Sequence, residues 1–220
     1  MSPEYTITDN TFDIRDADYR LRWIYKLEPI AAGIALVALL PAALALALVI
    51  AILSRRSPLI RHTRVGQHGS PLRMLKFRTM WARGFVAKRA MVVEDVIEAP
   101  QTLKSSGDPR VTSRFAAMCR RYSLDEIPQL YHVLCGEMSF VGPRPITRGE
   151  LDKYYGPQAS EVLRVRPGMT GLWQILGRSR ISYCRRKRLD LLLVRRSCPY
   201  LYFWILFRTV PKVMSGHDAC

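Results

Sequence analysis

The stretch Arg120-Arg121-Tyr122-Ser123-Leu124-Asp125-Glu126-Ile127-Pro128-Gln129-Leu130 is the segment from which the fold and the chemistry can be predicted. Ser123 and Glu126 have the S-x-x-E spacing of a capping box, which predicts a helix that begins at Ser123. Asp125 then lies in the first turn, where the helix dipole and free backbone N–H groups favour an ionised carboxylate. The same spacing also occurs at ordinary helix starts, where Asp125 would only interact favourably with the helix dipole.

Further motifs surround this stretch in a fixed order. They are K-F-R-T-M at Lys76–Met80, D-P-R-V-T at Asp108–Thr112, G-E-M-S-F-V-G-P-R-P at Gly136–Pro145 and R-P-G-M-T-G-L-W-Q at Arg166–Gln174. Together with S-L-D-E-I-P-Q-L they resemble the signature of the bacterial sugar transferases. These are monotopic phosphoglycosyl transferases, which charge a polyprenol phosphate at the start of exopolysaccharide and O-antigen assembly. The resemblance extends from Ile24 to Cys220.

The resemblance implies a two-step phosphoryl transfer. Asp125 would attack the sugar-linked phosphate of a nucleoside-diphosphate sugar, usually a UDP-sugar, and UMP would leave. Polyprenol phosphate would then attack the aspartyl phosphosugar, giving polyprenyl-diphosphate-sugar. A covalent carboxylate suits this scheme because both substrates can use one site in turn. Glu126 would orient the site or carry a proton of the acceptor, and Mg²⁺ at Asp125 would offset the repulsion between carboxylate and phosphate.

Cationic side chains around the carboxylates are the candidates for binding the phosphates. A planar guanidinium suits bidentate phosphate contacts, and two prolines fix the backbone on either side of Arg144. Arg120 and Arg178 match the family's acceptor-phosphate arginines. The residues expected to bind substrate are Lys76, Arg78, Arg110, Arg120, Arg121, Pro143, Arg144, Arg178 and Asp190.

Several of these positions have a second explanation. Alternation places Lys76 and Arg78 on one face of a strand, and spacing alone assigns that face to solvent. The Gly142–Pro145 turn also suits a rigid surface corner. Trp173 suits stacking on a base or, more commonly, burial in a core.

The chain departs from the family pattern at two places. Thr112–Ala117 lacks the usual glycine and is one residue longer, so the geometry around Ser113 stays open. The family has an aspartate at the position of Asp190, followed by a tyrosine and a second acidic residue. Leu192 and Tyr202 stand at those two places, and no family role is carried over to them.

An uncharged apolar run extends from Pro29 to Leu53. At about 1.5 Å per residue it is long enough to cross a bilayer as one helix. Pro41 removes a backbone hydrogen bond and predicts a kink. Basic residues flank both ends, and the positive-inside rule prefers both in the cytoplasm. A helix that re-enters at Pro41 satisfies that preference, whereas a kinked straight span is the alternative. The resemblance implies re-entry, although the family's Ser-Pro break is Leu40-Pro41 here.

The predicted fold is α+β and mostly helical. It is a small membrane-associated catalytic domain with a re-entrant broken membrane helix, a short β-hairpin and interfacial amphipathic helices. Its predicted divisions are a polar tail and membrane approach (1–28), the re-entrant helix (29–54) and a catalytic domain on the cytoplasmic face (55–220).

Within these divisions, Leu59–Arg64 and Leu72–Met80 are predicted to form the hairpin. Phe85–Glu98 and Arg148–Val165 are predicted to be helical, the second with an interruption near Gly156-Pro157. Tyr183–Met214 combines a basic cluster with an apolar, aromatic run. It suits a helix lying in the membrane interface or a core helix with a solvated face.

Charge and cysteine content narrow the cellular setting. The 34 lysines and arginines against 18 acidic residues give a net charge of +16, which indicates an anionic partner: nucleic acid, a membrane surface or phosphate-rich substrates. Five cysteines without a C-x-x-C pair argue against a disulfide framework or zinc site and fit a reducing compartment. We expect a bacterial inner-membrane location, with a UDP-sugar, polyprenol phosphate and inner-membrane lipids as partners.

Other functions are weighed against this one. A membrane-tethered nucleic-acid-binding protein would explain the charge, but no recognised nucleic-acid motif occurs, and we expect no nucleic-acid partner. A membrane phosphatase could use Asp125 as its nucleophile. A Walker-type kinase is disfavoured because G-x-x-x-x-G-K-[ST] is missing. A homodimer stays open, as do the identity of the sugar and the lipid length.

Overall fold

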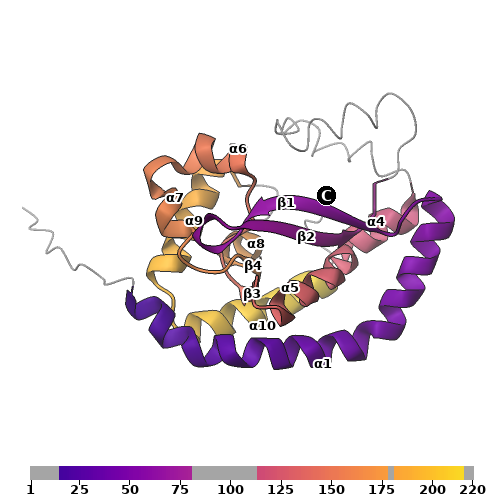
Figure 1. The fold of residues 1–220 in the computed structure, drawn as a ribbon, viewed down its shortest axis with the longest axis horizontal. Coiled ribbons are helices and arrows are strands. Elements are labelled where there is room, and N and C mark those ends of the chain that lie inside the picture. Colours follow the sequence, from indigo (N-terminus) through magenta and orange to yellow (C-terminus); the bar gives the residue numbers. More distant parts are fainter. Residues whose placement is uncertain (1–14, 81–112, 178–180, 216–220) are drawn as a thin grey trace, which may run out of the picture.

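The computed structural model describes residues 15–80, 113–177 and 181–215, and this part of the chain is mostly helical with two short two-stranded sheets (Figure 1). The predicted helix Phe85–Glu98 and the site candidates Arg110 and Arg178 lie outside the described residues.

The longest element is α1 (Arg15–Ser54), a single helix that begins well before the expected apolar run. Its segment Leu21–Ser54 is long and apolar enough to cross a membrane, by length and composition. Pro41 lies inside α1 without interrupting it, and the helix changes direction in its second half (Figure 1). The expected break is therefore a bend in a continuous helix. One lost hydrogen bond and the clash with the preceding turn can be absorbed in this way.

The N-terminal half of α1 packs against the folded body, and one residue near its C-terminal end is also buried. Leu21 and Ile24 are buried in a core cluster that also contains Ile205 of the C-terminal helix. Ala32 is buried beside Val133 in a second cluster, and Ile50 is 1% exposed. Between these points the six consecutive residues from Val37 to Ala42 are all exposed. The helix thus has buried positions towards both ends and an exposed apolar middle.

Glu28 fixes the N-terminal half of α1 to two distant elements. Its Oε1 accepts hydrogen bonds from the Ser139 hydroxyl (2.5 Å), the Phe140 N–H (2.9 Å) and the Tyr202 hydroxyl (2.7 Å). Burial, and then the charge of Glu28, raise the pKa of Tyr202 well above its usual range. Tyr202, which stands where the family pattern has an acidic residue, is therefore a hydrogen-bond donor that holds α1 in place.

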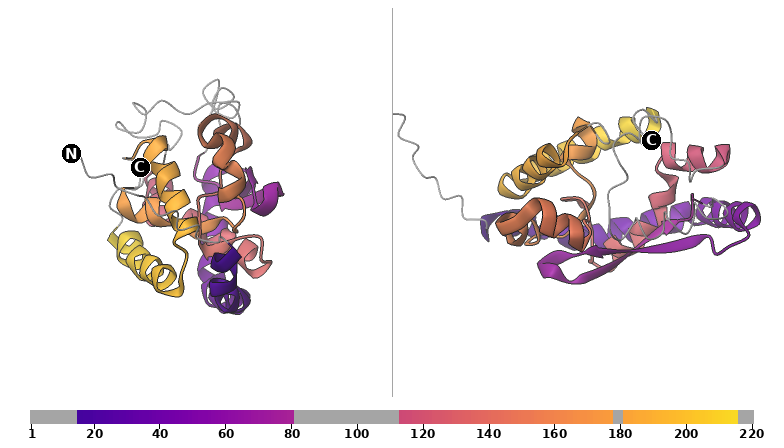
Figure 2. Two further views of the ribbon diagram at one scale, coloured as in Figure 1. Left: turned by 90° about the vertical axis from the view of Figure 1, so that its left-hand side faces the viewer. Right: turned by 90° about the horizontal axis from the view of Figure 1, so that it is seen from above.

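The predicted hairpin is present as the antiparallel pair β1 (Leu59–Val65) and β2 (Pro71–Phe77). The turn is η1 (Gln67–Gly69), where His68 and Gly69 have positive φ angles of 56° and 82°. Figure 2 shows the hairpin running along one side of the molecule. The predicted second strand extended to Met80, but the observed strand ends at Phe77.

The Asp125 segment follows α4 (Arg114–Arg121) as a 3₁₀ helix, η2 (Leu124–Gln129), and continues into α5 (Leu130–Leu134). Ser113 caps α4 by accepting a hydrogen bond from the Phe115 N–H at 3.2 Å, which gives the local geometry that the sequence left open. The α5 helix packs on α1, and η2 packs on β2. These contacts place the Asp-Glu pair between the hairpin and α4.

The second sheet is the parallel pair β3 (Ser139–Val141) and β4 (Gly168–Thr170). The backbones cross closely there: the Gly142 N–H donates to the Thr170 carbonyl and the Gly168 N–H donates to the Pro143 carbonyl. A Cβ on Gly168 would lie 2.0 Å from the Gly142 nitrogen. This contact fixes the turn that carries Arg144.

The remaining elements complete the domain. The predicted helix over Arg148–Val165 is interrupted as expected, by Gly156 at a φ of +52°. It consists of α6 (Arg148–Glu150), η3 (Leu151–Tyr155), η4 (Gly156–Gln158) and α7 (Ala159–Val162), and the chain then ends in α8 (Leu172–Leu176), α9 (Tyr183–Arg195) and α10 (Pro199–Ser215).

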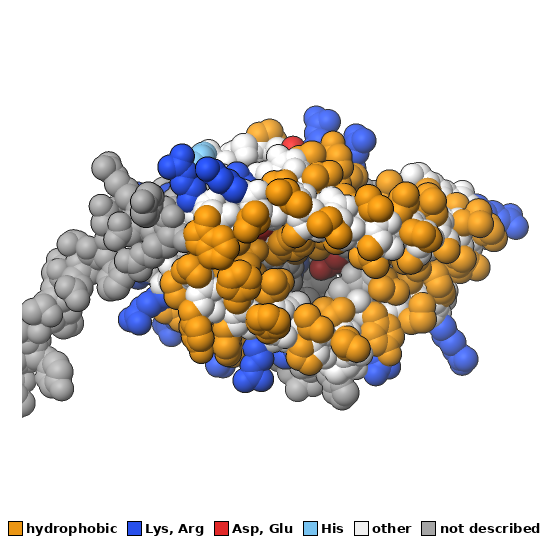
Figure 3. Space-filling view, turned by 90° about the horizontal axis from the view of Figure 1, so that it is seen from below, with side chains coloured by type: hydrophobic (Ala, Val, Ile, Leu, Met, Phe, Trp, Pro, Cys, Tyr) orange, Lys and Arg blue, Asp and Glu red, His pale blue; other side chains and the backbone are white. Residues whose placement is uncertain are grey.

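An apolar face covers the side of the molecule that carries α1 and α10 (Figures 1 and 3). The rings of Trp23 and Phe203 lie 6.2 Å apart and join the two helices. Figure 3 shows this face hollowed between the helices, with acidic side-chain atoms visible in the hollow. The apolar face is defined by the exposed side chains of Trp23, Leu27, Ile30, Ile34, Val37, Leu40, Leu44, Leu48, Tyr200, Phe203, Phe207, Val210 and Met214.

Candidate active site

Asp125 and Glu126 lie in a 3₁₀ turn, so the predicted capping box at Ser123 is wrong. Ser123 has left-handed angles (φ 55°, ψ 24°), and its side chain makes no capping hydrogen bond. An N-cap side chain reaches the helix N–H groups from an extended backbone, which Ser123 does not have. Pro128 also lacks the N–H that would extend an α-helix from Leu124. The turn is held by the Glu126 N–H on the Ser123 carbonyl at 3.1 Å.

The structure brings Lys76 to the acidic pair. Its Nζ lies 2.7 Å from Oε1 of Glu126, and both side chains are partly buried. Residues 50 positions apart in the sequence meet here because β2 packs against η2. The solvated-face explanation for Lys76 is therefore wrong.

Asp125 is the more buried of the two carboxylates, with 8% of its surface exposed. Burial raises the pKa of Asp125, and the charge of Glu126 adds to this effect, while Lys76 and Arg120 oppose it. Burial, followed by the charge of Asp125, also raises the pKa of Cys119 to about 11. The neighbouring thiol is thus protonated at neutral pH, which leaves the carboxylates of Asp125 and Glu126 as the acidic groups of this site.

The arginine side chains that were expected near Asp125 and Glu126 do not all lie beside these two carboxylates. Arg120 is half-buried and its charge acts on Asp125. Arg121 is exposed and lies over the Tyr122 ring at 5.8 Å. Arg78 follows the end of β2 and donates from Nε to the Ser57 carbonyl at 2.8 Å. Burial and the nearby Arg56 lower the pKa of Arg78. Of the predicted pair Lys76 and Arg78, the structure shows Lys76 in contact with a carboxylate of the acidic pair.

Arg144 belongs to a second polar cluster, on α8 and α9. Its guanidinium lies 4.8 Å from the ring centre of Trp173, and the guanidinium of Arg186 lies 4.6 Å from the same ring. Trp173 is 5% exposed, so it holds arginines rather than presenting a free face for base stacking. Pro143 is buried in the turn before Arg144.

Asp190 lies inside this cluster with none of its surface exposed. Its Oδ2 accepts a hydrogen bond from the Tyr155 hydroxyl at 2.8 Å. Burial raises the pKa of Asp190 to about 6, against the opposing effects of the Tyr155 hydrogen bond and the charge of Arg186. The geometry makes Asp190 a support of the Arg144 region, and direct contact with a substrate would require the cluster to open.

Asp125 and Glu126 together could hold a divalent cation. No group of three or more His, Cys, Asp or Glu side chains suited to a metal occurs among the residues that the structure describes. Mg²⁺ commonly uses one or two carboxylates and takes its other ligands from substrate phosphates and water. Two adjacent carboxylates in one turn fit that mode.

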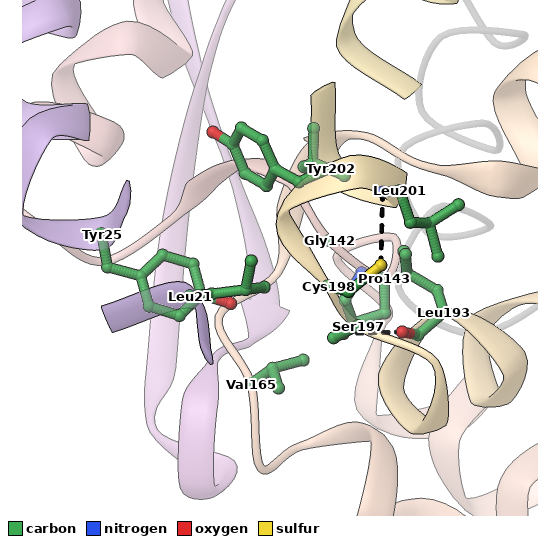
Figure 4. A pocket seen from close by; sticks show the side chains of 11 residues that line it. Leu21, Tyr25, Gly142, Pro143, Val165, Leu193, Ser197, Cys198, Leu201 and Tyr202 are labelled. Atoms are coloured by element: carbon green, nitrogen blue, oxygen red, sulfur yellow. Dashed lines mark hydrogen bonds between the residues drawn. The ribbon is translucent and has the colours of Figure 1, made fainter. Parts of the chain in front are cut away.

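A small apolar pocket lies elsewhere, between the start of α1 and the start of α10 (Figure 4). It is lined by Leu21, Tyr25, Val141, Gly142, Pro143, Val165, Leu193, Ser197, Cys198, Leu201 and Tyr202. Neither carboxylate of the acidic pair is among these residues, so chemical composition, and not concavity, locates the candidate site.

Comparison with known proteins identifies the family to which the chain belongs. The family model for bacterial sugar transferases matches residues 22–216, nearly the whole chain. The chain belongs to the bacterial sugar transferase family. The family predicted from the motifs is thereby confirmed.

Individual relatives of this sugar transferase agree with the family match. The exopolysaccharide production protein ExoY of Rhizobium meliloti is 38% identical over 197 residues, covering 88% of this chain and 86% of ExoY. The UDP-glucose:undecaprenyl-phosphate glucose-1-phosphate transferase of Caulobacter vibrioides is 33% identical over 207 residues, covering 88% and 70%. The undecaprenyl-phosphate galactose phosphotransferase of Salmonella typhimurium is 38% identical over 161 residues, which are 72% of this chain and 33% of that protein.

The enzyme class predicted from the motifs, a phosphoglycosyl transferase, is confirmed by these relatives. Sequence reasoning missed four side chains that organise the sugar transferase: Glu28, His132, Glu137 and Arg186. Glu137 stands in the G-E-M-S motif and was the one with a sequence signal. Glu28 and His132 have partners 57 or more positions away, and Arg186 contacts the rings of Trp173 and Tyr183.

Proposed function

We propose that this sugar transferase moves a sugar-1-phosphate from a UDP-sugar to polyprenol phosphate by way of an aspartyl phosphosugar on Asp125. Relatives named for undecaprenyl-phosphate sugar-phosphate transfer, in Caulobacter and Salmonella, support the reaction class. The observation that carries the mechanism is the burial of Asp125 beside the Lys76–Glu126 pair. A nucleophilic carboxylate held by flanking cations is what attack on a phosphate requires.

In the first step, an Asp125 oxygen forms a bond to the sugar-linked phosphorus. The bond from that phosphorus to the bridging oxygen breaks, and UMP leaves with the electron pair. In the second step, a phosphate oxygen of the polyprenol attacks the same phosphorus and the Asp125 carboxylate leaves. Both displacements occur at one phosphorus, so one carboxylate serves both substrates in turn.

The neighbouring residues supply charge and orientation. Lys76 contacts Oε1 of Glu126 at 2.7 Å, and Glu126 would orient the site or accept a proton from the acceptor phosphate. The positive charge of Arg120 acts to lower the pKa of Asp125, and Arg120 would bind an incoming phosphate. Asp125, with Glu126, would hold Mg²⁺, which supplies neutralisation of phosphate charge when bound. Arg144 is fixed against Trp173 and would contact the donor.

The apolar face explains how two dissimilar substrates reach one site. A UDP-sugar is water-soluble, whereas polyprenol phosphate lies in a membrane leaflet. We infer that α1 and α10 lie in the cytoplasmic leaflet of the inner membrane, because the N-terminal half of α1 packs on the folded body, Ile50 near its other end is buried, and the apolar middle is exposed. That placement holds the acidic pair near the headgroups, where both substrates can arrive.

The decisive experiment uses the full chain in detergent with UDP-sugars and undecaprenol phosphate, scored by UMP release. With donor alone, wild type should form a phosphosugar adduct at Asp125, seen by intact mass after acid quench, and should exchange labelled UMP into the donor. Asp125→Asn should lose both signals. Exchange that requires the lipid acceptor, or turnover by Asp125→Asn, would replace the covalent scheme with direct displacement.

Two controls separate the rival functions. Release of free sugar phosphate or inorganic phosphate without a lipid product would identify a phosphatase. Tight, sequence-dependent DNA binding at physiological salt would show that the +16 charge serves nucleic acid. We expect neither result.

A further inference from the structure

His132 connects two parts of the acidic site. Its Nε2 accepts a hydrogen bond from the backbone N–H of Leu75 at 3.0 Å, and its Nδ1 lies 2.6 Å from Oε2 of Glu137. The residue after Leu75 is Lys76, whose Nζ contacts Glu126. A continuous series of contacts therefore leads from the G-E-M-S motif through an imidazole and one peptide unit to the acidic pair.

The protonation of His132 follows from its partners. A backbone N–H can only donate, so Nε2 must carry a lone pair, and in the neutral ring the proton then sits on Nδ1. Glu137 accepts that proton in a hydrogen bond and thereby selects this tautomer, as a carboxylate beside a ring nitrogen commonly does. The imidazole is 4% exposed, so water does not readily replace either contact.

The hydrogen bond from Leu75 to His132 gives a partner to a backbone N–H on the outer edge of β2. Leu75 pairs with Arg61 across the hairpin, yet its N–H donates to His132 instead of to β1. In a two-stranded sheet, alternate N–H groups face outward and need another partner. His132 lies on α5, directly after η2, so its contact fixes the separation between β2 and the turn that carries Asp125.

We propose that His132 is a positioning residue for the phosphoryl transfer: it fixes β2 so that Lys76 reaches Glu126 beside Asp125. This proposal rests on the proposed function for its effect on turnover. It does not require His132 to touch substrate. A hydrophobic residue could fill the same volume, but it would leave the Leu75 N–H unpaired and the strand free to shift.

The test compares three variants of the full chain in detergent. His132→Leu keeps the bulk and removes the acceptor. His132→Gln keeps an acceptor oxygen at the end of a side chain of similar reach. Val162→Ala removes a buried valine on α7, whose core cluster contains no residue of β2 or α5, and so serves as the structural control.

We expect His132→Leu to lower kcat about tenfold or more, with the donor KM changed less than about threefold, because a small misplacement of a reacting group costs rate more than binding. His132→Gln should recover most of kcat. Val162→Ala should lower the melting temperature but keep kcat at a temperature where it is folded. A kcat near wild type in His132→Leu, no recovery in His132→Gln, or an equal kcat loss in folded Val162→Ala would overturn the proposal.

A second measurement does not depend on any activity. Hydrogen exchange at the Leu75 amide should accelerate about tenfold or more in His132→Leu and return toward wild type in His132→Gln, since loss of a buried acceptor opens that hydrogen bond. Unchanged exchange at Leu75 would overturn the positioning role even in an active enzyme. If wild type turns over no UDP-sugar but the exchange pattern is as expected, the proposed function fails while the structural connection stands.

Discussion

Asp125 is buried, although its proposed chemistry requires it to be ionised. Its pKa is raised in the folded protein, so the ionised side chain costs stability once the pH exceeds the ordinary aspartate pKa of about 3.9, and the full cost is present above the folded pKa. Asp125→Asn carries no charge and keeps the volume. It should abolish turnover and raise the melting temperature at pH 7.5, by roughly 2–4 °C for each kcal/mol relieved.

Two observations check that prediction by thermal unfolding in detergent. The difference in melting temperature between wild type and Asp125→Asn should shrink toward zero as the pH falls below about 4, where Asp125 is mostly protonated in both states. Added Mg²⁺ should stabilise wild type more than the variant. A less stable Asp125→Asn at pH 7.5 would contradict the electrostatic account.

Asp190 provides an independent pH test in the other polar cluster. Its pKa of about 6 in the folded protein exceeds the unfolded value near 3.9, so its charge costs on the order of 3 kcal/mol above pH 6. That cost disappears as the pH falls from 6 to 4. Asp190→Asn can still accept from Tyr155, and should be more stable than wild type at pH 7.5 by an amount that vanishes near pH 4. Denaturant unfolding at several pH values measures the difference, and a constant difference would refute it.

Some individual residues could be predicted from the sequence, and the reason is local. Asp125, Glu126 and Lys76 stand in motifs whose order indicated the family, and the structure brings all three together. The capping box failed because Pro128 and the left-handed Ser123 decide the turn. Glu28 and His132 were missed because their partners lie 57 to 174 positions away, and no periodicity encodes such a pairing.

The crossing of β3 and β4 determines where Arg144 can lie. Gly168 has no room for a side chain, since an added Cβ would meet the Gly142 nitrogen at 2.0 Å. Gly168→Ala should therefore destabilise the protein by several kcal/mol, because backbone must move to relieve the clash. Gly149→Ala is the matched control: no atom lies within 4 Å of its added Cβ, and in helix α6 alanine should be neutral or slightly stabilising.

Melting temperatures of the two variants, measured side by side, decide the matter. Equal stability would mean that the β3–β4 crossing tolerates a side chain and does not fix the Arg144 turn.

At the level of elements, the sequence predicted the hairpin, the interrupted Arg148–Val165 segment and the long apolar helix. It did not predict the parallel β3–β4 pair, whose three-residue strands are too short to show alternation.

The whole molecule presents its apolar face on one side, over α1 and α10 (Figure 3). If this face lies in a membrane, then charge added to it should weaken association without disturbing the site. Tyr200→Asp combined with Phe207→Asp should reduce binding to vesicles of mixed neutral and anionic lipids about tenfold or more, since buried apolar area drives interfacial binding. UMP exchange with the donor in detergent should remain.

Ser160→Asp is the control for added charge, because Ser160 is exposed on α7, away from the apolar face. It should leave vesicle binding within about twofold of wild type if apolar contact dominates. Equal losses in both proteins would show that general electrostatic attraction by the basic surface, and not the apolar face, holds the protein on the membrane.

The contacts of Glu28 have a consequence for the order in which the protein can be completed. Glu28 on α1 is synthesised before its partners: Ser139 comes 111 residues later and Tyr202 comes 174 residues later. Domains form as the chain emerges and distant contacts close last, so if α1 is the membrane anchor proposed above, it would enter the bilayer before the partners of Glu28 exist. A nascent chain stopped before α10 should therefore remain protease-sensitive, and release of the full chain should bring the anchor and the catalytic domain to their final arrangement together.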